Sequence, residues 1–239
     1  MTTITVTEKD YKENNLLYVQ STLAELSVRA GLIAECKKEK DRAIFTISVP
    51  DEYAEIVNAE VADRLAEIVV INYKYDFFTK NISVGGLNKT EKEILMASLI
   101  SADLEEDKRY SFERFRSERT VAIDGVFNFR LKPLKRKWEE IVSYMPSCFM
   151  GSQLREFVSY LLENKKKRIF IDRGRVYDVH YRRLKRCELL GGNEVNIVRE
   201  ALLSNCGEIE LNGEVPEDDE YYLKQFYTDK IFFSRGYDG

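Results

Sequence analysis

The sequence predicts a helix-rich α+β fold with small mixed sheets at the N-terminal and C-terminal ends. In several stretches apolar residues recur with alternating gaps of three and four, the spacing of a helix with one buried face. Short runs rich in β-branched residues lie near both ends of the chain. Among 239 residues there are only 4 Pro and 12 Gly, and 33% are charged, which is typical of a helical globule with few irregular stretches.

The N-terminal part is expected to alternate strands and helices. Residues 2–7 alternate threonine with apolar residues, which indicates a strand. One apolar stripe from 16 to 33 predicts a long helix with a glycine near its end. Residues 42–49 (RAIFTISV) form the next predicted strand, which Pro50 ends, and a helix with its buried face over 57–68 follows.

The middle of the chain is less regular. The aromatic residues of 73–78 fit either a continued helix or a loop, and the pattern does not decide between them. Gly85 and Gly86 mark a break. Thr90 with Glu93 has the spacing of a capping box, so a helix is expected to begin there. Residues 120–123 are expected to be extended.

The C-terminal part is expected to contain helices first and then strands and helices in alternation. Two helices are predicted over 131–145, with Pro133 in the first turn, and over 154–162. Two strands over 168–172 and 176–179 are expected to be joined by a turn at Gly174. After them a helix is predicted over 194–203, a strand over 208–211, a helix from 217 and a strand over 231–233. We therefore divide the chain into an N-terminal α+β module, residues 1–118, and residues 119–239, which hold a helical pair and a C-terminal α/β module.

Several functional classes lack their usual residues. No apolar run approaches the roughly 18–20 residues of a membrane span, and the start of the sequence does not resemble a secretory signal, so a cytoplasmic protein is expected. Cys36, Cys148, Cys187 and Cys206 are far apart, and His180 is the single histidine, so we expect no metal site and no cofactor. No nucleotide-binding, metal-hydrolase or nucleophile–base motif is found. We predict that the protein is not an enzyme.

One segment is strongly basic. Residues 128–190 hold 16 Lys and Arg against 7 Asp and Glu, a net charge of +9 in a chain whose total is −4. Two basic clusters flank the predicted strands that carry Phe170, Tyr177 and Tyr181; they consist of Lys165, Lys166, Lys167, Arg168, Arg182, Arg183, Lys185 and Arg186. Basic and aromatic side chains together are typical of a surface for phosphates and stacked bases. A solvated rim, or a face docked on the acidic part of the chain, is the alternative interpretation.

The most distinctive segment is residues 125–132, with the sequence GVFNFRLK. Gly125 is expected to permit a turn or a close backbone approach. In an extended segment Phe127 and Phe129 would share one face, and Asn128 and Arg130 would lie on the other. There Arg130 is expected to bridge to carboxylates or backbone carbonyls, or to bind a ligand together with Asn128.

This segment resembles the GFxNFRLK signature of the YtxC-like sporulation protein family. A long helix and a segment like residues 154–162 follow the signature in that family, as they do here. The chain departs from the pattern at Val126, where an aromatic residue is usual, and in residues 234–239, which contain no cysteine. The resemblance implies a cytoplasmic protein of endospore-forming bacteria, linked to sporulation, with no established catalytic activity, cofactor or ligand.

The residues predict a non-catalytic protein that acts through a protein partner, and the resemblance implies that it is a sporulation-associated bacterial protein. Its predicted binding residues are Gly125, Phe127, Asn128, Phe129 and Arg130. A nucleic-acid-binding protein that uses the basic surface of residues 165–186 is the alternative. The sequence does not specify the partner or the oligomeric state.

Overall fold

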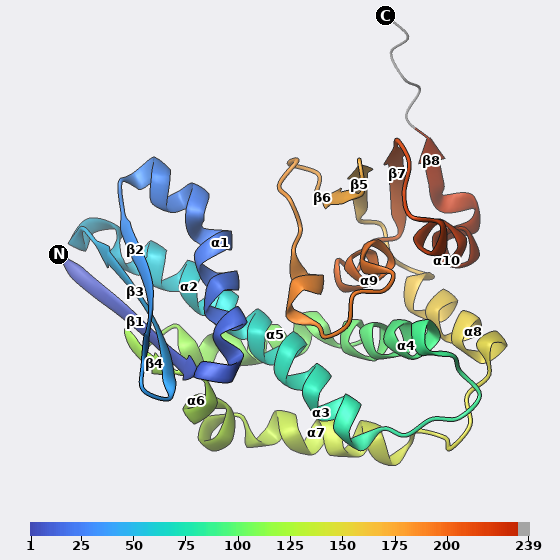
Figure 1. Cartoon of the computed structure of the whole chain (residues 1–239), viewed down its shortest axis with the longest axis horizontal. Helices are drawn as coiled ribbons and strands as arrows, with labels where there is room; N and C mark the ends of the chain where they lie inside the picture. The colour runs from blue at the N-terminus through green and yellow to red at the C-terminus, as the bar shows by residue number, and fades with distance from the viewer. Residues whose placement is uncertain (234–239) are drawn as a thin grey trace, which may run out of the picture. The chain divides into compact units, whose positions relative to one another are not determined.

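The computed structural model describes residues 1–233, without the side chains of Glu25 and Arg29; the tail of residues 234–239 lies outside this part. Helices make up 58% of the described residues, whose strands form two four-stranded mixed sheets, which confirms the predicted helix-rich α+β fold (Figure 1). The chain forms two compact units, each built from separated stretches. The first unit holds residues 1–76 and 105–141, and the second holds 77–104 and the chain from 142 onward. The division at residues 118 and 119 is a different one and stays a prediction.

The first unit contains a sheet with the strand order β2-β3-β1-β4. Its strands are β1 (Thr2–Lys9), β2 (Ile33–Glu39), β3 (Arg42–Val49) and β4 (Thr120–Ala122). The first three are antiparallel neighbours, whereas β4 pairs with β1 in parallel and ends the sheet. Alternate residues of β1 and β3, such as Ile4, Val6 and Phe45, are buried, so one face of the sheet packs into the core.

Helices and one π-helical turn complete the first unit. The elements are α1 (Glu13–Ala30), α2 (Ala54–Ile68), the π-helical turn η3 (Val69–Tyr73), the start of α3 (Lys74–Asn81), α5 (Leu104–Phe115), α6 (Ile123–Arg130) and α7 (Lys132–Ser143). Residues 73–78, left open by the sequence, are therefore helical. Pro133 lies in the first turn of α7, as predicted.

The prediction of one helix from 16 to 33 is wrong. Helix α1 ends at Ala30, because Gly31 takes the left-handed conformation with φ 62°, and the N–H of Leu32 donates to the carbonyl of Ser27 at 2.8 Å. Ile33 then begins β2, which pairs with β3 along its whole length. The apolar spacing runs by chance across a helix end and into an exposed strand.

The second unit contains a sheet with the order β6-β5-β7-β8. Its strands are β5 (Arg168–Asp172), β6 (Arg175–Tyr177), β7 (Glu208–Asn212) and β8 (Ile231–Phe233), and its helices are α4 (Lys89–Ser101), α8 (Gly151–Leu162), α9 (Asn196–Leu203) and α10 (Glu217–Tyr227). Strands β5, β7 and β8 are parallel, whereas β5 and β6 form the predicted hairpin. Arg173 and Gly174, with φ 46° and 72°, make its two-residue turn.

The capping box of α4 lies two residues before its predicted position. Asn88 is the N-cap: its Oδ1 accepts from the N–H of Glu91 at 2.8 Å, and its own N–H donates to Glu91 Oε2 at 2.9 Å. Thr90 instead donates to Glu194 at 2.8 Å. Glu93 forms an ion pair with Arg199, whose side chain is fully buried. The sequence thus contains two possible capping pairs, Asn88 with Glu91 and Thr90 with Glu93, and the first of them begins the helix.

Candidate functional site

The GVFNFRLK segment is helical, so its prediction as an extended segment is wrong. Residues 123–130 form α6, which follows β4 directly. Neighbours two apart lie on opposite sides of a helix, and accordingly Phe127 is 9% exposed whereas Phe129 is 77% exposed. Asn128, Phe129 and Arg130 are exposed together at the end of α6. The helix thus divides the segment into a buried anchor and an exposed end.

Gly125 does not form the predicted turn or close approach. It lies inside α6, where an added Cβ would meet only the Cβ of Ala122, at the ordinary contact distance of 3.5 Å. Its lack of a side chain instead leaves space over β4. The small residue keeps a depression between helix and strand open.

This depression, which we call the signature pocket, has a volume of about 240 Å³. Its lining includes Glu118, Thr120, Ala122, Gly125, Phe129 and Arg130. Arg130 Nη1 lies 2.7 Å from Glu118 Oε1, so the predicted carboxylate partner of Arg130 is present, and both side chains are partly exposed. The pocket therefore combines an apolar ring with an accessible pair of opposite charges.

An edge strand forms one wall of the signature pocket. The carbonyl of Arg119 accepts from the N–H of Thr5 at 2.8 Å, and the carbonyl of Val121 accepts from the hydroxyl of Thr7 at 3.4 Å, so both face β1. Because successive peptide groups of a strand point to opposite sides, those of Thr120 point away from β1. An edge strand with outward peptide groups is a place where an extended chain can pair.

Phe127 fixes α6 on a buried aromatic row. Its ring centroid lies 4.6 Å from that of Tyr73 and 5.8 Å from that of Trp138. The Tyr73 hydroxyl donates to Glu8 Oε2 at 2.8 Å, and Trp138 Nε1 donates to Asp107 Oδ2 at 3.1 Å. Phe127 is thus a scaffold residue rather than a ligand contact. It connects the signature to two buried carboxylates.

Asp107 is the centre of a buried charge cluster. Its Oδ2 lies 3.0 Å from Lys74 Nζ, and the side chains are 1% and 0% exposed. Lys137 Nζ lies 2.8 Å from the other oxygen. Burial raises the pKa of the Asp107 carboxyl, but the Lys74 charge and the hydrogen bonds from Lys137 and Trp138 outweigh it and hold that pKa below its usual value. The cluster locks α3, α5 and α7 together.

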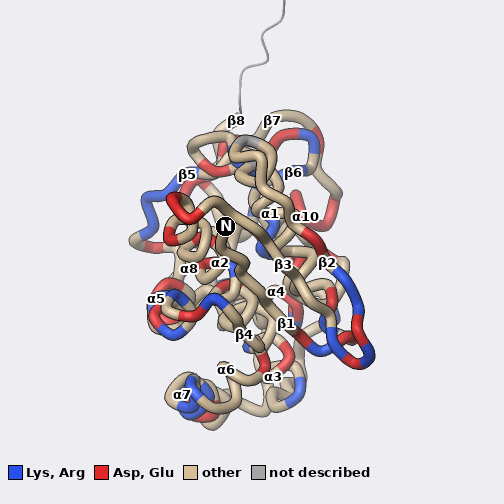
Figure 2. Tube along the Cα trace, turned by 90° about the vertical axis from the view of Figure 1, so that its left-hand side faces the viewer, with Lys and Arg blue, Asp and Glu red and all other residues tan. Residues whose placement is uncertain are grey.

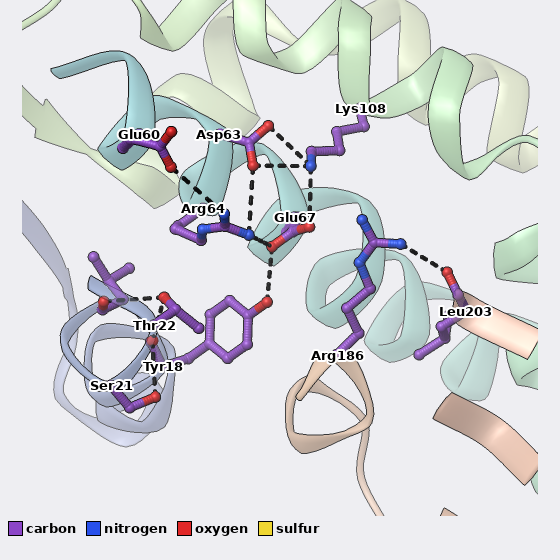
Figure 3. A network of polar contacts seen from close by, with 11 residues as sticks. Tyr18, Ser21, Thr22, Glu60, Asp63, Arg64, Glu67, Lys108, Arg186 and Leu203 are labelled. Atoms are coloured by element: carbon purple, nitrogen blue, oxygen red, sulfur yellow. Dashed lines mark hydrogen bonds and ion pairs between the residues drawn. The ribbon is translucent and has the colours of Figure 1, made fainter. Parts of the chain in front are cut away.

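A second polar network surrounds Glu67, whose carboxylate is also buried (Figure 3). Glu67 Oε2 accepts from the Tyr18 hydroxyl at 2.7 Å and from Arg64 at 2.7 Å. Lys108 donates to Glu67 Oε1 at 3.0 Å and to Asp63 at 2.9 Å. Donors from α1, α2 and α5 converge on one carboxylate, so the network positions these helices.

Sequence reasoning missed Glu8, Glu67, Lys74 and Asp107. Burial raises the pKa of Glu8, although the Lys9 amide, Tyr73 and Asn15 partly oppose this by donating hydrogen bonds. The sequence indicates the burial of Glu67 only by its position, because this residue lies between the apolar Leu65 and Ile68 of the buried face of α2. Such acids fit a structural role, since each has donors in place.

The second unit holds its own buried polar groups. Glu200 is fully buried, and its Oε2 accepts from the N–H of Cys187 at 2.7 Å. Burial and the Glu200 charge raise the pKa of Cys187, and burial raises the pKa of Cys206 to about 12. Burial likewise raises the pKa of Cys36. These three thiols are poor nucleophiles, because the thiolate is the reactive form.

The described residues offer little to metal chemistry or to a membrane span. Over residues 1–233, no group of three His, Cys, Asp or Glu is placed to hold a metal ion. His180 is exposed in a turn, where its N–H donates to Asp178 Oδ1 at 2.8 Å. Within the same range, no helix combines the length and apolar character needed to cross a membrane.

The predicted basic surface is only partly available. Its residues lie before β5, within β5 and after β6, and Figure 2 shows Lys and Arg in blue around these strands. Arg168 pairs with Glu208 at 2.7 Å, and Arg183 lies 3.5 Å from Glu188. Lys167 and Arg186 donate to backbone carbonyls of Ser204 and Leu203, at 3.1 and 2.9 Å. Lys166 and Arg182 are exposed, and Lys165 and Lys185 are half-buried.

Comparison with known proteins adds no assignment. No family model, no curated protein and no solved structure matches this chain.

Proposed function

We propose that this protein is a non-catalytic interaction protein that binds a protein partner at the signature pocket. The observation that carries this proposal is the exposure of Phe129, 77%, beside the pocket and the Arg130–Glu118 pair. A large exposed apolar ring at the rim of a depression is typical of a protein contact, and aromatic and Arg residues dominate binding energy in such contacts.

The chemistry of the partner follows from the pocket walls. The outward peptide groups of Thr120 offer one donor and one acceptor to an extended chain. Phe129 offers an apolar face, and Arg130 and Glu118 offer opposite charges at its side. The proposed partner segment is therefore an extended peptide with an apolar residue next to a charged one.

The buried networks support a scaffold that presents this surface. Phe127 packs between Tyr73 and Trp138, and both rings are tied to buried carboxylates. A surface held on rigid elements loses little conformational entropy when it binds. The raised pKa values of three thiols and the hydrogen-bond donors that face Glu67 and Asp107 favour a binding role over nucleophilic chemistry.

We further propose, from the resemblance of residues 125–132 to the YtxC-like signature, that the protein acts in the cytoplasm of sporulating bacteria. Phe127, at the variable position of the signature, then belongs to the scaffold, and Asn128, Phe129 and Arg130 contact the partner. The resemblance covers most of the chain, and its specific part is the signature.

Affinity capture from sporulating cells tests the proposed function. The tagged chain, the Phe129→Ser variant and a Tyr11→Ser control are compared by quantitative mass spectrometry; Tyr11 is 73% exposed in the same unit. We expect a protein that the wild type and the control retain and that Phe129→Ser loses by at least tenfold. The same proteins at the same levels in all three samples would overturn the proposal.

A further inference from the structure

The sheet of the second unit has one buried and one outward face. Ile169 and Ile171 of β5 are buried, and so are Ile209 and Leu211 of β7. The residues between them belong to the opposite side, which we call the outer face, because side chains alternate along a strand. Its described residues range from half-buried to exposed.

A row of five side chains crosses the outer face. The strand register places Tyr177 opposite Phe170, Phe170 opposite Glu210, and Glu210 opposite Phe232. A further bridge places Arg183 opposite Tyr177. Directly paired residues share a face, so the order across the sheet is cation, two aromatics, carboxylate and aromatic. With strands about 4.8 Å apart, the row spans about 19 Å.

Tyr181 adds a second layer to this row. Its ring stacks on Phe170, with centroids 4.9 Å apart and planes inclined by 21°, while the residue remains 71% exposed. Tyr181 has φ 56°, a left-handed conformation that is costly for a residue with a side chain. A turn at Asp178 holds it: the Asp178 carbonyl accepts from the N–H of Tyr181 at 3.0 Å, and the carboxylate accepts from the N–H of Arg182 at 2.9 Å. The backbone is strained to present this ring.

The charges define which polymer fits. From 165 to 188 there are ten Lys and Arg against Asp172, Asp178 and Glu188, and with Glu208 and Glu210 of β7 the net charge is +5. Asp172, Glu208 and Glu210 belong to the outer face, and Arg168 of β5, on the same face, pairs with Glu208 at 2.7 Å and lies 3.8 Å from Glu210. Basic residues such as Arg175 and Arg182 are exposed at the β6 side of this face. Neutral bases can therefore approach the row while phosphates stay at the flank.

We propose that the outer face binds single-stranded nucleic acid. Bases stack on Tyr181 and on the aromatic residues of the row, and the phosphates run beside Arg175, Arg182 and Arg183. A duplex cannot present its bases to such a surface, and its backbone would meet the carboxylates instead. The site lies on the second unit and uses none of the residues of the signature pocket.

Fluorescence anisotropy with the full chain tests this inference. The probes are labelled 12-nucleotide oligo(U) RNA, oligo(dT) DNA and a 12-base-pair DNA duplex. Saturable binding to at least one single strand is expected, at least tenfold tighter than to the duplex. With about three phosphate contacts, the logarithm of the association constant should fall with the logarithm of salt with a slope of about −2. The two single-stranded probes show whether RNA or DNA is preferred.

Variants at exposed positions separate stacking from charge. Tyr181→Ala should weaken single-strand binding by about tenfold or more, because one stacked base is lost, and Tyr181→Phe should bind within twofold of wild type. Phe232→Ala tests the far end of the row in the same way. Tyr160→Ala, at a residue 74% exposed on α8, is the matched control and should not change binding. Absent binding by the wild type, equal binding to the duplex, or unchanged affinity in both Tyr181→Ala and Phe232→Ala would overturn the proposal.

Discussion

Replacing Asp107 by asparagine should destabilise the first unit strongly. Lys74 is fully buried and lies 3.0 Å from the Asp107 carboxylate, so the substitution leaves its ammonium group in the core without this counter-charge. Removing one partner of a buried ion pair typically costs about 3–5 kcal/mol. The amide oxygen can still accept from Trp138 or Lys137, so we expect a loss of about 3–4 kcal/mol in unfolding free energy.

A double-mutant cycle isolates the pair. Lys74→Met should cost less, about 1–3 kcal/mol, because the carboxylate keeps Lys137 at 2.8 Å and Trp138 at 3.1 Å. Combining Lys74→Met with Asp107→Asn removes the ammonium group that the single variant leaves buried. The double variant should therefore be more stable than the sum of the single effects predicts, by about 2 kcal/mol or more.

The chain contains its own fluorescent probe for this experiment. Trp138 is the one tryptophan in the sequence and donates to Asp107, so its fluorescence during urea unfolding reports on the first unit. The folded pKa of Asp107 is lowered, so its contribution is present above the unfolded pKa and is lost as the pH falls through the folded pKa. The advantage of wild type over Asp107→Asn should shrink in that acid range. A change below 1 kcal/mol at neutral pH, or strict additivity in the cycle, would refute the reasoning.

Two further predictions concern the second unit. Burial and the Glu200 charge raise the pKa of Cys187, so at pH 8 iodoacetamide should modify the exposed Cys148 much faster than Cys187. Glu200→Gln should speed the reaction of Cys187. Equal modification rates of the two cysteines, measured by mass spectrometry, would contradict this prediction. Gly174→Ala should lower the free energy of unfolding by about 1–2 kcal/mol, because of the positive φ alone. Gly192→Ala should lower it by more, because the new Cβ there also meets the Glu93 carboxylate, which the buried Arg199 holds. Equal urea midpoints of the Gly192→Ala and Gly174→Ala variants, measured by circular dichroism, would refute the expected steric conflict at position 192.

The elements with strong periodicity could be predicted from the sequence. The hairpin at Gly174 and the helix that carries Pro133 are where the local residues placed them, because turn chemistry and apolar spacing act over a few residues. The exposed strand β2 has no buried alternation to reveal it, and the apolar spacing of α1 continues into Ile33. Gly31 alone sets the end of α1, so the apolar spacing by itself extends the predicted helix too far.

The signature shows why the site was harder to predict. Alternating Phe127 and Phe129 resemble a strand, but residues 123–130 form α6, in which Phe127 packs on Tyr73 and Trp138 while Phe129 is exposed. The buried charges could not be predicted from the sequence for a different reason. Lys74 and Asp107 are 33 residues apart, so only the tertiary fold shows that their burial is compensated.

The most direct measurement is site-specific photo-crosslinking from position 129. A photoreactive phenylalanine replaces Phe129 in one sample and Tyr11, an equally exposed residue of the same unit, in another, and both are irradiated in sporulating cells. We expect a discrete crosslinked protein from position 129 that is absent from position 11 and is lost when Arg130→Glu is added. No crosslink at 129, or the same products from both positions, would contradict the claim that this surface binds a partner.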